Sequence, residues 1–208
     1  MSTARAGAAV TGAALAVLAA GCNSNAPVPA SPFGVSTNSP TTSSPSGTSA
    51  TSTSAHAGDN TRLLITARDI LAPHDTYAAQ PPTLNPNGTQ GAEVLFTNQD
   101  QTRAIGDTIV ILPNAAAAPS ALQEATATLG TSVTGGTPQP SPVGTGGTVV
   151  SGMSPDGAKA MTILLFTEGR AFVRLEFDSA PGKATSPDFV TDVGQKQDIA
   201  LRTGLSAS

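Results

Sequence analysis

The residues of this sequence that could do chemistry are few and lie far apart. Ser154 lies in the run GMSPDG of residues 152–157, where glycines flank a serine much as they do in a nucleophile elbow. This run is one residue too long for that motif. Its last part, Pro155 to Gly157, is typical of a hairpin turn. We therefore expect a turn at Ser154 and no nucleophile.

Two carboxylates, Glu176 and Asp178, alternate along an expected strand and so share one face of it. Paired carboxylates can carry out acid–base catalysis. Arg174 shares that face, so an exposed ion pair with Glu176, contributing about 0–1 kcal/mol, is the simpler interpretation. We expect no catalytic residues here and no enzymatic activity.

The residue types that hold metals and cofactors are scarce. The chain has one cysteine and two histidines, His56 and His74, whereas a zinc site takes three or four protein ligands. His74 follows Pro73 in an expected surface turn. The glycine cluster at 144–147 matches neither the dinucleotide fingerprint nor the phosphate-binding loop. We expect no metal and no cofactor.

The charge distribution excludes nucleic acid as a partner. The formal net charge is −4, and the ten basic residues form no cluster. The chain also has one tyrosine and no tryptophan, which disfavours sugar binding by aromatic stacking.

Cys22 is the only cysteine, and the residues before it explain its presence. Residues 1–21 have one basic residue, an uncharged stretch rich in Ala, Val and Leu, and small residues at the end, as in a signal peptide. The run LAAGC at 18–22 resembles the lipobox of bacterial lipoproteins, although Ala19 stands where leucine is usual. This resemblance implies that Cys22 becomes the amino terminus and carries a diacylglyceryl group with palmitate-like chains. Two acyl chains suffice for stable anchoring.

Residues 22–59 are expected to form the lipidated cysteine and a disordered tether. Of the 36 residues at 23–58, 21 are Ser, Thr or Pro, and such a segment buries too little apolar surface to fold. As a flexible coil it would span roughly 30–36 Å. The chain would then lie on the outer face of the plasma membrane and extend into the cell wall. The tether resembles O-glycosylated stalks, and an unmodified spacer fits equally well.

Residues 60–208 are expected to form a single α+β domain, an antiparallel sheet of about five strands with two or three helices packed on it. Alternating apolar residues and turn signals predict strands at 93–97, 104–112, 148–153, 159–167 and 170–178. Capping patterns and apolar periodicity predict helices at 67–72, 114–129 and 187–204.

The last two strands form an expected hairpin that turns at Glu168-Gly169, with Phe166 opposite Ala171. One of its faces has the pattern of a core. The other face carries four apolar side chains, Met161, Ile163, Leu165 and Phe172. This face is either covered by a helix or open as a groove for an apolar ligand or partner.

Together, the signal peptide, the lipobox, the tether and a small acidic domain resemble the cell-envelope lipoproteins of mycobacteria. The order of elements across 60–205 is similar to the PsbP-like domains of LpqN-type lipoproteins and to extracellular sensor domains of actinobacterial kinases. The first resemblance implies a location. The second implies only a fold, and no binding residue follows from it.

The function expected first is that of a non-enzymatic envelope lipoprotein whose domain binds an envelope protein partner. The alternative is a carrier or sensor of an apolar small molecule or lipid. Such a carrier would use the Met161, Ile163, Leu165 and Phe172 face or a pocket beneath the 131–147 loop. A carrier needs a persistent apolar cavity, whereas an interaction module needs only an exposed patch.

Overall fold

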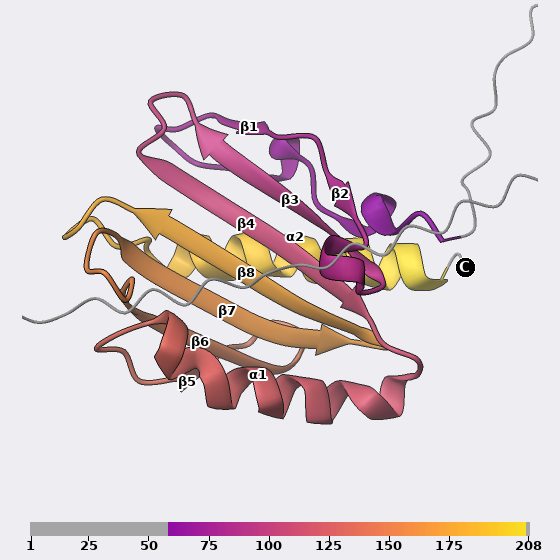
Figure 1. Cartoon of the computed structure of the whole chain (residues 1–208). Helices are drawn as coiled ribbons and strands as arrows, with labels where there is room; N and C mark the ends of the chain where they lie inside the picture. The colour runs from indigo at the N-terminus through magenta and orange to yellow at the C-terminus, as the bar shows by residue number, and fades with distance from the viewer. Residues whose placement is uncertain (1–57, 207–208) are drawn as a thin grey trace, which may run out of the picture. The chain divides into compact units, whose positions relative to one another are not determined.

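A computed structural model describes residues 58–206 of the chain (Figure 1). The predicted signal peptide at 1–21, Cys22 and nearly all of the predicted tether at 22–59 lie outside the described residues. These assignments therefore stay predictions.

The described part of the chain is built on one antiparallel sheet of eight strands, in the order β1-β3-β4-β8-β7-β6-β5, with β2 also paired to β3. The strands are β1 (Tyr77–Ala79), β2 (Thr83–Leu84), β3 (Gly91–Asn98), β4 (Arg103–Ile111), β5 (Gln139–Pro140), β6 (Thr145–Met153), β7 (Ala160–Glu168) and β8 (Ala171–Ser179).

The prediction of about five strands was wrong, although the class is α+β. The five predicted segments correspond to β3, β4, β6, β7 and β8. The three missed strands are two or three residues long, too short for an alternating pattern to show. They also lie beside or contain proline, which is tolerated at the edges of a sheet and signals a turn in a sequence.

Two α-helices and four 3-10 helices complete the described residues. They are α1 (Ala118–Ser132), α2 (Pro187–Ser206), η1 (Asn60–Leu63), η2 (Ala67–Asp69), η3 (Pro86–Gly88) and η4 (Ala115–Ala117). The helix expected at 67–72 is only η2, but its capping box is present: Asp69 accepts a hydrogen bond from the Thr66 backbone N–H at 2.8 Å. The helix expected at 114–129 begins as η4 with Asn114 as N-cap and continues as α1.

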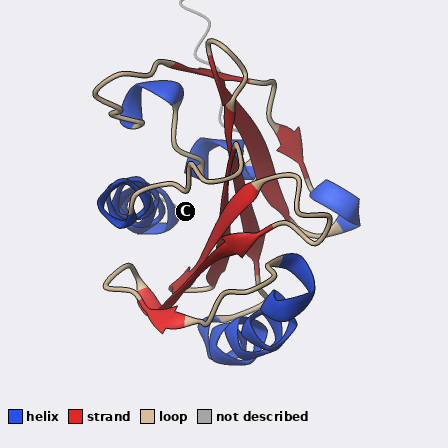
Figure 2. Cartoon of the chain, turned by 90° about the vertical axis from the view of Figure 1, so that its left-hand side faces the viewer, coloured by secondary structure: helices blue, strands red, loops and turns tan. Residues whose placement is uncertain are grey.

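The two α-helices lie on opposite faces of the sheet (Figure 2). Helix α1 packs against β6, β7 and β8 on one face. Helix α2 packs on the other face, together with η1. At Gly194 the α2 backbone lies so close to the sheet that an added Cβ would come within 2.5 Å of the Leu164 side chain. A larger residue at this position would require the Leu164 and Val143 side chains to shift.

The β7–β8 hairpin has a register two residues away from the predicted one. Its turn is Gly169-Arg170, with Gly169 at φ +55°, and Phe166 pairs with Val173 where Ala171 was predicted. A glycine fits this turn because the position has a positive φ. Because side chains alternate with a period of two, a shift of two residues leaves every residue on its predicted face.

Candidate ligand cleft

The four residues of the predicted apolar face lie beneath α1. Ile163 and Leu165 are completely buried (0% exposed), and Met161 and Phe172 are partly buried beside them. The side chains that cover them come mainly from one face of α1: Leu122, Ala125 and Leu129. This face is therefore covered by a helix and is not an open groove.

The large apolar side chains that stay exposed in the described residues are scattered. Leu71, Leu84, Leu95 and Ile199 are 43–64% exposed and belong to different elements. Leu84 pairs with the buried Ala92, whereas Leu95 alternates with the buried residues of β3 and points to the opposite face. These four residues come from four separate parts of the chain.

A cleft of about 360 Å³ opens on the α2 side of the sheet, between the first turn of α2 and the β5–β6 edge. Its volume lies within the range of about 300–1,000 Å³ that is usual for small-molecule sites. It is lined by Thr137, Gln139, Pro140, Ser141, Pro142, Val149, Ser151, Thr162, Pro187, Val190 and Thr191. The first five belong to the 131–147 segment, beneath which a pocket was one of the two sites considered for a carrier.

The outer wall of the cleft is a segment held by β6 and by the core. Residues 139–140 pair with β6, and the Ser141 N–H donates to the Gly147 carbonyl at 2.8 Å. Two residues further on, Val143 is inserted into the main core and is almost fully buried. The wall is therefore anchored by backbone hydrogen bonds and by one buried side chain.

The floor of the cleft is formed by alternate residues of β6 and β7. Val149 pairs with Leu164, and Ser151 pairs with Thr162 in the same register. The hydroxyl oxygens of Ser151 and Thr162 lie 2.9 Å apart, and either one can donate. Pro187, Val190 and Thr191 of α2 face this floor. The cleft thus combines aliphatic and proline surfaces with a few hydroxyl groups, and none of its lining residues is charged or aromatic.

A second cavity lies where the 72–77 segment meets the start of α2. His74 is exposed at its rim, as expected for a solvated histidine. Asp75, which also lines this cavity, accepts a hydrogen bond from Asn98 at 3.1 Å and pairs with Arg103 at 3.6 Å. Tyr77 stacks on Phe189 with 6.2 Å between ring centroids, and burial, followed by the charge of Asp75, raises the pKa of Tyr77. The charges here are already paired with one another.

Ser154 and its carboxylate neighbour Asp156 form the turn that the sequence predicts. The Ser154 hydroxyl donates to Asp156 at 2.5 Å and accepts from the Lys159 backbone N–H at 3.0 Å. The Gly157 N–H closes the turn by donating to the Ser154 carbonyl at 2.8 Å. The hydrogen bonds from Ser154 and the Ala158 backbone lower the pKa of Asp156. The carboxylate beside this serine therefore has a lowered pKa, which makes it a weak base for activating a nucleophile.

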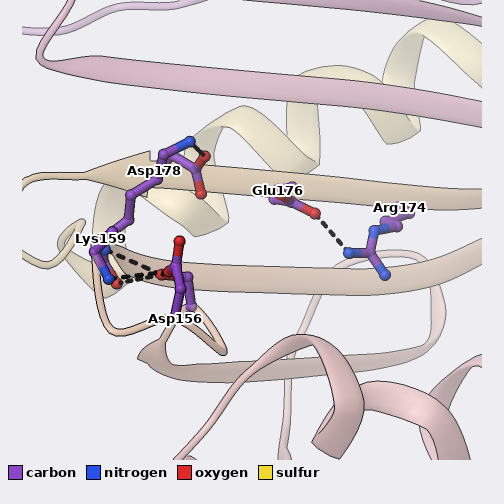
Figure 3. A network of polar contacts seen from close by, with 7 residues as sticks. Asp156, Lys159, Arg174, Glu176 and Asp178 are labelled. Atoms are coloured by element: carbon purple, nitrogen blue, oxygen red, sulfur yellow. Dashed lines mark hydrogen bonds and ion pairs between the residues drawn. The ribbon is translucent and has the colours of Figure 1, made fainter. Parts of the chain in front are cut away.

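The strand carboxylates are held in ion pairs (Figure 3). Glu176 pairs with Arg174 at 2.5 Å, as expected from the sequence, and Asp178 pairs with Lys159 at 2.7 Å. The hydrogen bond to Asp178 raises the pKa of Lys159. Within residues 58–206, no group of three or more His, Cys, Asp or Glu side chains is arranged to hold a metal ion. No helix in that range is long and apolar enough to cross a membrane.

Sequence reasoning missed one buried carboxylate. Asp107 of β4 is completely buried, and neither of its carboxylate oxygens has a hydrogen-bond partner among the described residues. Loss of solvation raises its pKa to about 8, although the nearby Ile65 backbone N–H acts in the opposite direction. The signal was available: Asp107 alternates with Ile105 and Ile109, which face the core.

The sequence analysis did not identify the individual residues that line the cleft. A pocket beneath the 131–147 loop was one of two sites considered for a carrier, but neither the hydroxyl pair nor the contribution of α2 was identified. Both depend on strand register and on the position of α2, which lies far from β6 in the sequence.

Comparisons with known proteins give one structural similarity. No family model matches the sequence, and no curated protein matches it. Among solved structures, the fold is similar to the extracellular domain of PknH from Mycobacterium tuberculosis, with a TM-score of 0.49 and 9% sequence identity over 67% of this chain and 93% of that one. At this level of similarity, no ligand, activity or location passes from that protein to this chain.

Proposed function

We propose that this chain is a membrane-anchored, non-enzymatic lipoprotein of the cell envelope that binds a small apolar molecule in the cleft between α2 and the β5–β6 edge. Diacylation of Cys22 would anchor the chain on the outer face of the plasma membrane. The binding domain would act as a carrier or a sensor. The proposal combines the lipid anchor predicted at Cys22 with the alternative function of the sequence analysis, a carrier or sensor of an apolar molecule.

The observation that carries the proposal is the cleft itself. It has the volume of a small-molecule site, aliphatic and proline walls, and few polar groups. Meanwhile the face first considered as an exposed patch is filled by α1. A cleft of this size, together with the covering of the predicted apolar face by α1, favours a small ligand over a protein partner.

Native mass spectrometry tests the proposal. The chain from residue 23 onward keeps every residue of both apolar clusters and lacks the acylated cysteine. After incubation with a detergent-free lipid extract of a bacterial envelope and repurification, it should carry a reproducible mass excess that organic solvent releases. Thr191→Trp, which fills the cleft, should abolish this excess, and Ile199→Trp on the exposed side of α2 should keep it. A chain of unaltered mass, or an excess that both variants keep, would contradict the proposal.

A protein-interaction role is the second candidate, and one observation supports it. On the sheet face that bears α1, a groove runs over β3 and β4, and Leu95 is 45% exposed there. Its other lining residues include Pro81, Glu93 and Thr108. If an envelope protein docks at this groove, Leu95→Asp should abolish its crosslinking to the chain, while Leu71→Asp should not.

A further inference from the structure

The residues that line the cleft also indicate whether its ligand is charged or neutral. Side chains that could neutralise a carboxylate, a phosphate or an ammonium group are absent from the eleven lining residues, whose polar members are hydroxyls and one amide. Moving an ionised group into such surroundings without a partner is strongly unfavourable. A ligand that buries its polar end here therefore needs an uncharged one.

The amino terminus of α2 is the one feature that could favour an anion, and two residues oppose it. Pro187 occupies the start of the helix and has no N–H to donate. Asp188 lies in the first turn, where its negative charge offsets the partial positive charge of the helix end. Both residues therefore weaken the preference of this helix terminus for a carboxylate.

The hydroxyl pair on the floor fits a neutral hydrogen-bonding group. Thr162 is almost fully buried, and Ser151, its partner at 2.9 Å, is exposed at the cleft. Because either oxygen can donate, Ser151 can turn its hydrogen toward a ligand carbonyl or accept from a ligand hydroxyl. Aromatic side chains, which stack on sugars and grip proline-rich peptides, are absent from this lining.

We propose that the cleft selects uncharged amphiphiles, an aliphatic chain ending in a hydroxyl or ester group, over fatty-acid anions of the same chain length. This inference rests on the proposed function. It specifies the ligand class of the same site, with Ser151 as a residue that can hydrogen-bond the polar end of the ligand.

Calorimetric titration of the chain from residue 23 onward with three dodecyl compounds tests it. The neutral probe is 1-monolauroylglycerol, the anion is laurate and the cation is dodecyltrimethylammonium, each below its micelle concentration. The neutral probe should bind at least about tenfold more tightly than either ion. If laurate binds as tightly as the neutral probe, the inference fails and the cleft function stands. If none of the three binds, the proposed function fails with it.

Two pairs of variants sharpen this result. Thr191→Lys places a cation in the cleft and should raise the affinity for laurate about tenfold, whereas Ile199→Lys puts the same charge on the exposed side of α2 and should not. Ser151→Ala should weaken 1-monolauroylglycerol binding roughly two- to tenfold, the range of one lost hydrogen bond. Thr128→Ala on α1 should leave that binding unchanged. Equal effects within either pair would overturn the assignment to this cleft.

Discussion

Gln197 of α2 holds the backbone at Leu63 through its side-chain amide. Its Nε2 donates to the Leu63 carbonyl at 2.8 Å, and its Oε1 accepts from the Ile65 N–H at 3.0 Å. Gln197 is fully buried and 132–134 residues away from these partners in the sequence. One side chain therefore fastens the first described segment of the chain to the last helix.

Replacing Gln197 should be costly. In Gln197→Ala two buried backbone groups lose their partners, each worth about 1–3 kcal/mol, so the free energy of unfolding should fall by at least about 2 kcal/mol. Urea denaturation measures this change. Gln195→Ala, at an exposed position of the same helix, is the matched control and should change stability by less than about 0.5 kcal/mol. Similar small effects of both substitutions would contradict this role.

Asp107 should make stability depend on pH. Its pKa is about 8 in the folded state and near 3.8 in the unfolded chain, so the folded state binds the proton more tightly. The stabilisation is complete below about pH 4 and is lost as the pH rises toward 8. Compared with Asp107→Asn, the wild-type chain should lose roughly 1–4 kcal/mol of stability between pH 5 and pH 8.

Urea denaturation at both pH values gives this comparison. Glu124→Gln, on the exposed side of α1, is the control and should follow the wild-type pH dependence. A parallel pH dependence in Asp107→Asn and the wild-type chain would show that Asp107 is not protonated in the fold.

Leu165 should act as a core residue and not as a ligand contact. Leu165→Ala removes a completely buried side chain beneath α1, which costs about 2–5 kcal/mol of unfolding free energy. In the folded population, binding of 1-monolauroylglycerol should stay within about twofold of wild type. A tenfold loss of affinity with unchanged stability would instead place the ligand site on the α1 side of the sheet, at Leu165.

Cys22→Ser tests the anchor. The change removes the one thiol that can be acylated, so the chain should lose palmitate labelling and no longer fractionate with membranes as a diacylated protein. Ser24→Ala, two residues further on, should keep both properties. Unchanged labelling of the Cys22→Ser chain would contradict lipidation at this position.

The parts of the fold that were predictable depend on local patterns. The turn at Ser154, the capping box at Thr66 and the faces of β7 and β8 all follow from residues within a few positions of one another. The face of Ile163 was predicted, but whether a helix covers it depends on where α1 packs.

What could not be predicted depends on contacts across the chain. The two-residue strand β5 exists because β6 pairs with it, and its own residues, Gln139 and Pro140, do not favour a strand. The cleft needs this pairing, the β6–β7 register and the first turn of α2 at the same time. No stretch of sequence contains all three, so only the structure brings Ser151 and Thr191 to one site.

Methyl chemical-shift mapping tests the central claim most directly. The chain from residue 23 onward, labelled at its Val, Leu and Ile methyl groups, is titrated with 1-monolauroylglycerol and separately with laurate, so the result does not depend on which of the two binds more tightly. The account predicts that the largest saturable shifts occur at Val149 and Val190, which line the cleft, while Ile163 and Leu165 beneath α1 respond little. Shifts centred on Leu95, or no saturable shifts with either probe, would contradict a ligand site between α2 and the β5–β6 edge.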